Sequence, residues 1–137
     1  GDQSTELNVY AAAHPAALKL LGHRPNDELP PLYGAADLFL MPSRAEAFPR
    51  VVLEAMACGA PVVSTDVGTV ARIIPPSWHA ETLVPAEDLT AFCARTVALV
   101  GETDTRARLA AELRQRALDY DVHRVAEQYR DLLTRPL

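Results

Sequence analysis

Two glutamates, Glu46 and Glu54, have the chemistry and the setting of a pair that binds hydroxyl groups. Glu46 stands just before a predicted helix, and Glu54 lies inside that helix among apolar residues. A carboxylate buried without a partner is costly, so a hydrogen-bonding ligand would explain its presence there. An ionised carboxylate accepts hydrogen bonds from two vicinal hydroxyls at once, as a ribose presents them. We therefore expect Glu54 to bind a ribose and Glu46 to bind a sugar.

Arg50 falls in the first turn of the same helix. The first amides of a helix lack partners and carry partial positive charge, which makes a helix start a ready anion site. A diphosphate held there between two sugars would be a nucleotide sugar. Each residue also has a plainer interpretation, because Glu46 could cap the helix and Glu54 and Arg50 could be solvated surface residues.

The elements that position these residues alternate between strand and helix up to residue 100, which predicts βαβ units and a parallel sheet. The wholly apolar run 38–41 predicts a strand buried on both faces. Loop 43–48 follows it, at the carboxyl edge where such sheets bind ligands. The predicted strands are 17–22, 38–41, 61–65 and 82–84, and the predicted helices are 4–13, 26–36 (with Asn26 as cap), 49–57, 69–74, 87–100, 106–118 and 122–133.

Composition excludes several classes of protein. The 137 residues carry a net charge of −5 with scattered positive residues, which argues against a nucleic-acid partner. No apolar run approaches the roughly 20 residues of a transmembrane segment. Cys58 and Cys93 fit no metal spacing, so we expect two free, buried thiols in a reducing cytoplasm.

A longer run carries a family resemblance. The stretches AADLFLMPS at 35–43, EAFP at 46–49 and LEAMACGAPVV at 53–63 closely resemble the group 1 (family 4) glycosyltransferases of GT-B architecture. The resemblance covers essentially the whole chain and is most specific from Leu32 to Asp66. It implies an α/β fold: part of a Rossmann-like, doubly wound parallel sheet from the C-terminal, donor-binding domain, with extra C-terminal helices.

The resemblance implies a role for each residue of the two-glutamate run. Glu54 would hold the ribose hydroxyls of a nucleotide-sugar donor, and Glu46 would sit by the transferred sugar as the catalytic candidate. The backbone amides of Ala47 and Phe48 would approach the sugar and the distal phosphate, and Arg50 would support the diphosphate.

The resemblance also implies the reaction, which is transfer of a hexose from the donor to an acceptor with retention of configuration. It implies no cofactor and no bound metal. The loop 22–25, with His23 and Arg24, would lie near the nucleobase. The chain departs from the family pattern at several positions. Ala47 replaces a usual glycine, Arg72 replaces a glutamate, and a glycine expected near Glu81 is absent.

By the same resemblance, the acceptor domain and the first strands of the donor domain are missing from residues 1–137. We therefore expect the isolated chain to be inactive and to need the missing N-terminal part or a partner chain, for instance in an intertwined dimer. The parent enzyme would be cytoplasmic, and could be peripheral to the inner face of the membrane. The alternatives are a split-subunit binding module, or an epimerase or hydrolase of the same architecture.

Overall fold

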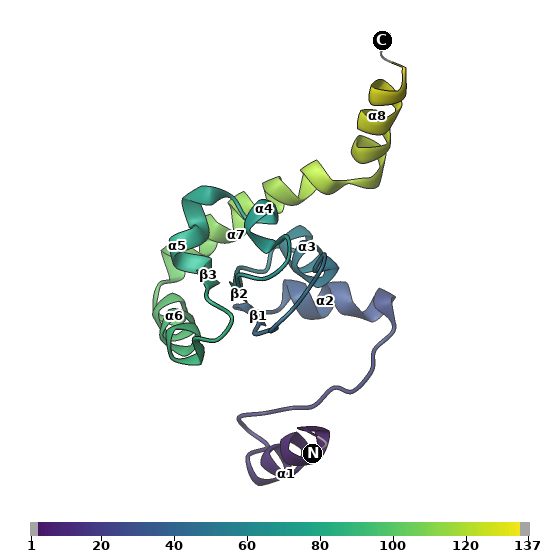
Figure 1. Ribbon diagram of the computed structural model, residues 1–137. Coiled ribbons are helices and arrows are strands. Elements are labelled where there is room, and N and C mark those ends of the chain that lie inside the picture. Colours follow the sequence, from purple (N-terminus) through teal and green to yellow (C-terminus); the bar gives the residue numbers. More distant parts are fainter. Residues whose placement is uncertain (1–2, 135–137) are drawn as a thin grey trace.

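A three-stranded parallel sheet lies at the centre of the protein (Figure 1), whose computed structural model describes residues 3–134. Its strands are β1 (Phe39–Met41), β2 (Val62–Thr65) and β3 (Leu83–Val84), in the order β1-β2-β3. Phe39 pairs with Val62, and Ser64 pairs with Leu83. The parallel sheet expected from the apolar runs is confirmed, and all four residues of β2 are buried.

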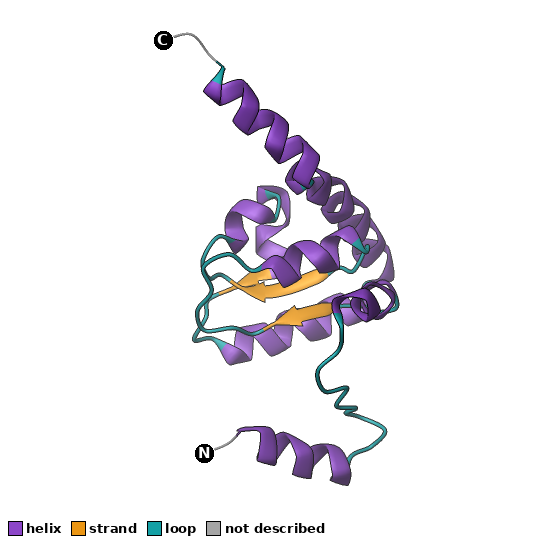
Figure 2. Ribbon diagram, turned by 90° about the vertical axis from the view of Figure 1, so that its right-hand side faces the viewer, coloured by secondary structure: helices purple, strands orange, loops and turns teal. Residues whose placement is uncertain are grey.

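Helices lie on both sides of this sheet (Figures 1 and 2). Helix α3 (Arg50–Ala57) contacts β1, β2 and helix α7 (Thr103–Ala117), whereas α6 (Leu89–Gly101) contacts β2 from the other side. The other helices are α1 (Gln3–Ala13), α2 (Leu29–Gly34), α4 (Val70–Ile73), α5 (His79–Thr82) and α8 (Val122–Leu133), with single 3₁₀ turns η1 (Asn26–Glu28), η2 (Pro76–Trp78) and η3 (Leu118–Tyr120). Within residues 3–134, no helix combines the length and apolar character that crossing a membrane requires.

The core forms where α3 crosses α7 over the sheet. Val52 and Met56 of α3 and Leu109 and Leu113 of α7 are fully buried, together with Val62 of β2. Spacings of four residues place each helical pair on one face of its helix. Burial of these apolar side chains is what seats α3 against the sheet.

The bounds of α3 follow from its flanking residues. Pro49 precedes the first turn, where a missing N–H costs nothing. Gly59 follows the end with a φ of 84°, and the amide of Ala60 donates to the carbonyl of Ala55 (3.0 Å). A residue in the left-handed region suits glycine, so proline and glycine fix the two ends as the sequence predicts.

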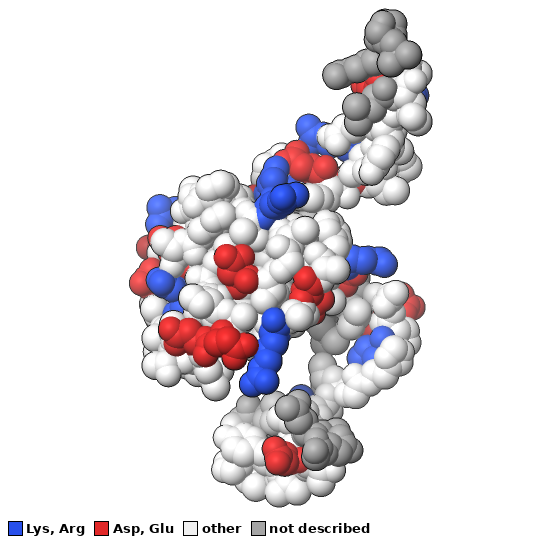
Figure 3. Space-filling model, viewed as in Figure 1, with Lys and Arg blue, Asp and Glu red and all other residues white. Residues whose placement is uncertain are grey.

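The two ends of the described chain extend away from this body. Helix α1 lies apart from the sheet at the end of a long linker, and α8 projects from the opposite side (Figures 1 and 2). On the face seen in Figure 3, Lys and Arg are scattered and form no continuous stripe.

The predicted strand 17–22 is wrong. These residues form part of an exposed loop, in which the amides of Ala17 and Leu18 donate to the carbonyl of His14. A strand exists only where a neighbour completes its backbone hydrogen bonds, and none of β1 to β3 pairs with this segment. The apolar side chains of Leu20 and Leu21 are accordingly exposed.

Two further predictions need correction. Asn26 does not cap one helix over 26–36, because a 3₁₀ turn at 26–28 precedes the shorter α2, which carries two prolines in its first turns. Strand β1 is not buried on both faces, since Leu40 is 42% exposed. β1 is an edge strand of the described sheet, and α6, on the far side from α3, contacts β2 instead.

Replacing Leu113 by alanine should lower the free energy of unfolding by about 2–5 kcal/mol, because it opens a cavity between α3 and α7. The matched control is Leu133→Ala on α8, whose side chain is 85% exposed and which should change stability by less than about 0.5 kcal/mol. Urea denaturation followed by circular dichroism measures both. Equal losses in the two variants would contradict this description of the core.

Candidate functional site

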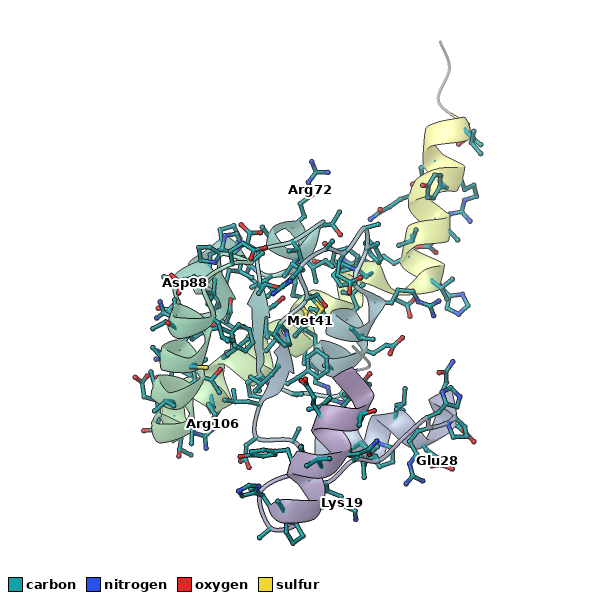
Figure 4. All side chains as sticks on the ribbon, turned by 60° about the horizontal axis from the view of Figure 1, so that its bottom comes forward. Lys19, Glu28, Met41, Arg72, Asp88 and Arg106 are labelled. Carbon is teal, nitrogen blue, oxygen red and sulfur yellow. The ribbon has the colours of Figure 1, made fainter. Side chains whose placement is uncertain are left out.

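The loop at residues 42–49, named here the Glu46 loop, leaves the carboxyl end of β1 and leads into α3. Thr65, at the end of β2, anchors its beginning. The Thr65 hydroxyl donates to the carbonyl of Ser43 (2.5 Å) and lies 3.2 Å from that of Met41. In Figure 4, Met41 lies centrally among the side chains of the body. The Glu46 loop is therefore fixed to the edge of the sheet where ligands of parallel sheets bind.

The turn after β2 packs directly under the middle of this loop. Gly68 has a φ of 57°, and a Cβ added there would overlap the carbonyl oxygen of Glu46 and lie 2.8 Å from that of Ala47. The Thr69 hydroxyl donates to the Ala47 carbonyl (3.4 Å). Only glycine satisfies both the backbone angle and this close approach. The position of Glu46 therefore depends on a residue 22 positions further along the chain.

The side chains of the Glu46 loop are largely open to solvent. Glu46 is exposed, and its Oε1 accepts a hydrogen bond from the Ser43 hydroxyl (3.1 Å). Ala47 is exposed, and Phe48 is 49% exposed although it is a large apolar residue. This loop thus presents a carboxylate and an aromatic ring next to the start of α3.

The start of α3 leaves positive charge available. The amide of Arg50 donates to the carbonyl of Phe48 (2.9 Å) and the amide of Val52 to that of Pro49 (3.1 Å), while the Val51 amide has no backbone acceptor among the described residues. Within residues 3–134, no carboxylate lies within 4 Å of the Arg50 guanidinium, which is exposed. A helix start with an unpaired arginine has the electrostatics of an anion site.

Glu54 and Arg50, one turn apart on α3, line the same pocket of 340 Å³. Glu54 is half-buried, points at this cleft and makes no ion pair with a described cation. The pocket lies between α3 and the segment around α2, and its volume falls in the usual range of small-molecule sites, about 300–1,000 Å³. Its other lining residues are Asn26, Leu29, Pro30, Tyr33, Ala57 and Cys58.

Tyr33 is a pocket residue that the sequence patterns did not single out. Its hydroxyl donates to Glu54 Oε2 at 3.4 Å. Burial, followed by the negative charge of Glu54 and the hydrogen bond to it, raises the pKa of the Tyr33 phenol above the ordinary value. The phenol therefore stays protonated at neutral pH and acts as a donor toward the carboxylate. A contact between residues 21 positions apart leaves no local signal in a sequence.

His23 and Arg24 lie on the linker before α2, in the segment that Lys19 and Glu28 mark in Figure 4. Both are exposed, and Arg24 donates to the carbonyl of Leu21 (3.0 Å) and pairs with Glu28 (3.4 Å). The linker reaches the pocket through Asn26 instead. The structure thus brings Arg50 and Glu54 together, sets the Glu46 loop before the same helix, and leaves His23 and Arg24 outside the pocket lining.

Both cysteines are free thiols, as predicted, but only one is shielded. Cys58 is half-buried at the end of α3 and lines the pocket, whereas Cys93 is exposed on α6. The expectation of burial is wrong for Cys93 because it lies on the outward face of an amphipathic helix.

Replacing Gly68 by alanine should displace the Glu46 loop and destabilise the protein. Positive φ alone costs about 1–2 kcal/mol, and the overlap with the Glu46 carbonyl should add roughly 1–3 kcal/mol. Gly22→Ala is the matched control, because Gly22 has a φ of 66° but nothing within 4 Å of an added Cβ. Urea titration measures the unfolding free energy of both variants. A G68A variant no less stable than G22A would contradict the close packing of Gly68 against the Glu46 loop.

Comparison with known proteins identifies a family. Residues 1–102 match the family described as "Glycosyl transferases group 1". The chain is 36% identical over 124 residues to a D-inositol 3-phosphate glycosyltransferase of Corynebacterium urealyticum, covering 88% of this chain and 29% of that protein. It is 37% identical over 108 residues to the lipopolysaccharide core biosynthesis mannosyltransferase LpsB of Rhizobium meliloti, covering 78% of this chain and 30% of that protein. It thus spans less than a third of the length of these relatives.

The fold agrees as well. A sucrose-phosphate synthase from Thermosynechococcus elongatus superimposes with a TM-score of 0.76 at 24% identity, over 97% of this chain and 35% of that one. This likeness concerns the fold, which is the α/β architecture of part of a GT-B glycosyltransferase. The family match over residues 1–102, more than half of the chain, shows that the chain belongs to the group 1 glycosyltransferases.

Proposed function

We propose that this chain is the nucleotide-diphospho-sugar-binding part of a retaining glycosyltransferase that transfers a hexose to an acceptor. The observation that carries the proposal is that Arg50 and Glu54 line one pocket along α3, the helix that follows the Glu46 loop. In this arrangement Glu54 is available for the ribose of the donor, Arg50 for the diphosphate and Glu46 for the transferred sugar.

The ribose would be bound by Glu54. Its carboxylate is half-buried and faces the pocket without a cation among the described residues, so hydroxyl donors are the partners that suit it. A carboxylate that accepts two vicinal hydroxyls replaces the water it loses on burial. The geometry thus favours a ribose over a group without hydroxyls.

The diphosphate would lie at the start of α3, against the Arg50 guanidinium and the Val51 amide, which has no backbone acceptor within residues 3–134. Negative charge grows on the leaving diphosphate during transfer, and fixed positive groups there stabilise the transition state. In this proposal they act without a metal ion and without a cofactor.

The transferred sugar would contact the Glu46 loop, with Glu46 as the catalytic candidate and the amides of Ala47 and Phe48 beside it. Support comes from the anchoring of this loop by Thr65 and Gly68, which fixes its backbone relative to the sheet. The nucleobase would lie toward His23 and Arg24, on the linker that enters the pocket at Asn26. The two free cysteines fit a cytoplasmic location.

A second candidate is a binding module that needs another polypeptide, supplied by the same protein, by a partner subunit or by an intertwined dimer. The specific observation is that β1 ends the described sheet on one side and exposes Leu40. An unpaired edge of this kind is open to a further strand. In both cases we expect no hexose transfer by the isolated chain.

Replacing Glu54 by alanine should weaken binding of a ribonucleoside diphosphate by about 1–3 kcal/mol, because a carboxylate contact to hydroxyls is lost. Isothermal titration with UDP, GDP and ADP identifies the tightest-binding probe and measures the change. The control is Glu127→Ala, which removes an exposed carboxylate from α8. Identical affinities in the two variants would remove Glu54 from the site.

Replacing Arg50 by glutamine should weaken binding of the same diphosphate about tenfold, or ~1.4 kcal/mol, and leave binding of the phosphate-free nucleoside unchanged. The loss should shrink at high salt, since the guanidinium is exposed and salt screens its charge. Arg130→Gln, on α8, is the control for net charge. A loss as large in R130Q, or equal for nucleoside and diphosphate, would argue against a phosphate contact.

A further inference from the structure

Tyr33 is the one side chain among the described residues that forms a hydrogen bond with Glu54. The contact joins α2 to α3 across the pocket, and both residues line that pocket. The phenol reaches Oε2 of the carboxylate, so Oε1 and the second lone pair of Oε2 are left for other donors. Tyr33 therefore restricts how the carboxylate can turn.

Tyr33 is itself held from two directions. Its ring packs edge-to-face against Phe39 of β1, with ring centres 5.6 Å apart and planes at 81°. Helix α2 also packs on α3, and a Cβ added at Gly34, the next residue, would be in ordinary van der Waals contact with the carbonyl oxygen of Cys58, at 3.7 Å. Because the ring packs on β1 and its helix packs on α3, the phenol hydroxyl occupies a defined position relative to Glu54.

In this contact the Tyr33 phenol is the donor and Glu54 Oε2 is the acceptor. Burial raises the pKa of the Tyr33 phenol most, and the negative charge of Glu54, the hydrogen bond to it and, least, Cys58 raise it further. The phenol thus keeps its proton at neutral pH and can donate.

We propose that Tyr33 is a positioning residue that fixes the Glu54 carboxylate for the 2′- and 3′-hydroxyls of a nucleoside diphosphate, and thereby sets a preference for ribose over deoxyribose. This rests on the proposed function. A carboxylate free to rotate would still accept one hydroxyl, but the pairing with two hydroxyls at once requires a set plane. If the carboxylate loses this orientation, binding of the ribonucleotide should weaken more than binding of the 2′-deoxynucleotide. The preference for ribose should therefore fall.

The test is isothermal titration of the 137-residue chain with the tightest-binding of UDP, GDP and ADP, and with the 2′-deoxy counterpart of that probe. Tyr33→Phe keeps the ring that packs on Phe39 and removes only the hydroxyl. We expect Y33F to bind the ribonucleotide about 3- to 10-fold more weakly while its affinity for the deoxynucleotide changes less than about twofold. Tyr10→Phe, on the distant helix α1, is the matched control.

The outcomes distinguish a failure of the role of Tyr33 from a failure of the proposed function. An unchanged ratio of ribonucleotide to deoxynucleotide affinity in Y33F, with the ratio lost in Glu54→Gln, would overturn the role of Tyr33 and leave the proposed function intact. If the unsubstituted chain binds none of the three diphosphates, the proposed function fails and this inference fails with it.

A second measurement needs no ligand. The ultraviolet absorbance of tyrosinate, titrated in the unsubstituted chain and in Y33F, gives the Tyr33 curve by difference. Its midpoint should lie above the ordinary tyrosine value of about 10, and it should fall in Glu54→Gln because the negative charge is gone. An equal midpoint in E54Q would show that the phenol does not contact Glu54, which would contradict the proposal.

Discussion

Everything at the candidate site depends on the seating of one short helix, α3, against the sheet. Val52, Ala55 and Met56 are buried, and they follow the three- and four-residue spacing that forms one apolar face. Arg50 and Glu54 are spaced four residues apart on another face, which lines the pocket. The same eight residues therefore supply part of the core and the charged groups of the site, and the burial of one face fixes the direction of the other.

The loop in front of α3 is fixed by a different kind of constraint. Thr65 and Gly68 belong to the end of β2 and the turn after it, yet they determine where the Glu46 loop can run. Parallel strands place such turns at a common edge, so two segments far apart in sequence meet there. The pocket and the Glu46 loop are thus positioned by one packed unit of sheet, turn and helix.

The sequence predicted the parts that rest on local pattern. The buried strands 61–65 and 82–84, the helix bounded by Pro49 and Gly59, and the amphipathic helices after residue 87 are all present near their expected limits. Long-range structure was less accessible. The apolar run 17–22 has the composition of a strand but no neighbour to pair with, and Leu40 is exposed because its sheet ends there.

The candidate site also has a part that local pattern predicts and a part that it does not. The sequence predicts Glu46, Arg50 and Glu54 because all three lie within one loop and the helix that follows it. The places of Tyr33 and Asn26 in the pocket follow from the packing of the segment around α2 against α3. Nothing in the local sequence distinguishes a pocket tyrosine from a core one. The link from Gly68 to Glu46 is likewise a property of the folded chain.

The central claim is that the half-buried carboxylate of Glu54 on α3 binds a ribose. A crystal structure of the chain with the nucleoside diphosphate that it binds most tightly tests this directly. The account predicts the Glu54 oxygens within hydrogen-bonding distance of the 2′- and 3′-hydroxyls, with the diphosphate at the first turn of α3. A ribose bound elsewhere, or a Glu54 side chain turned away from the nucleotide, would contradict it.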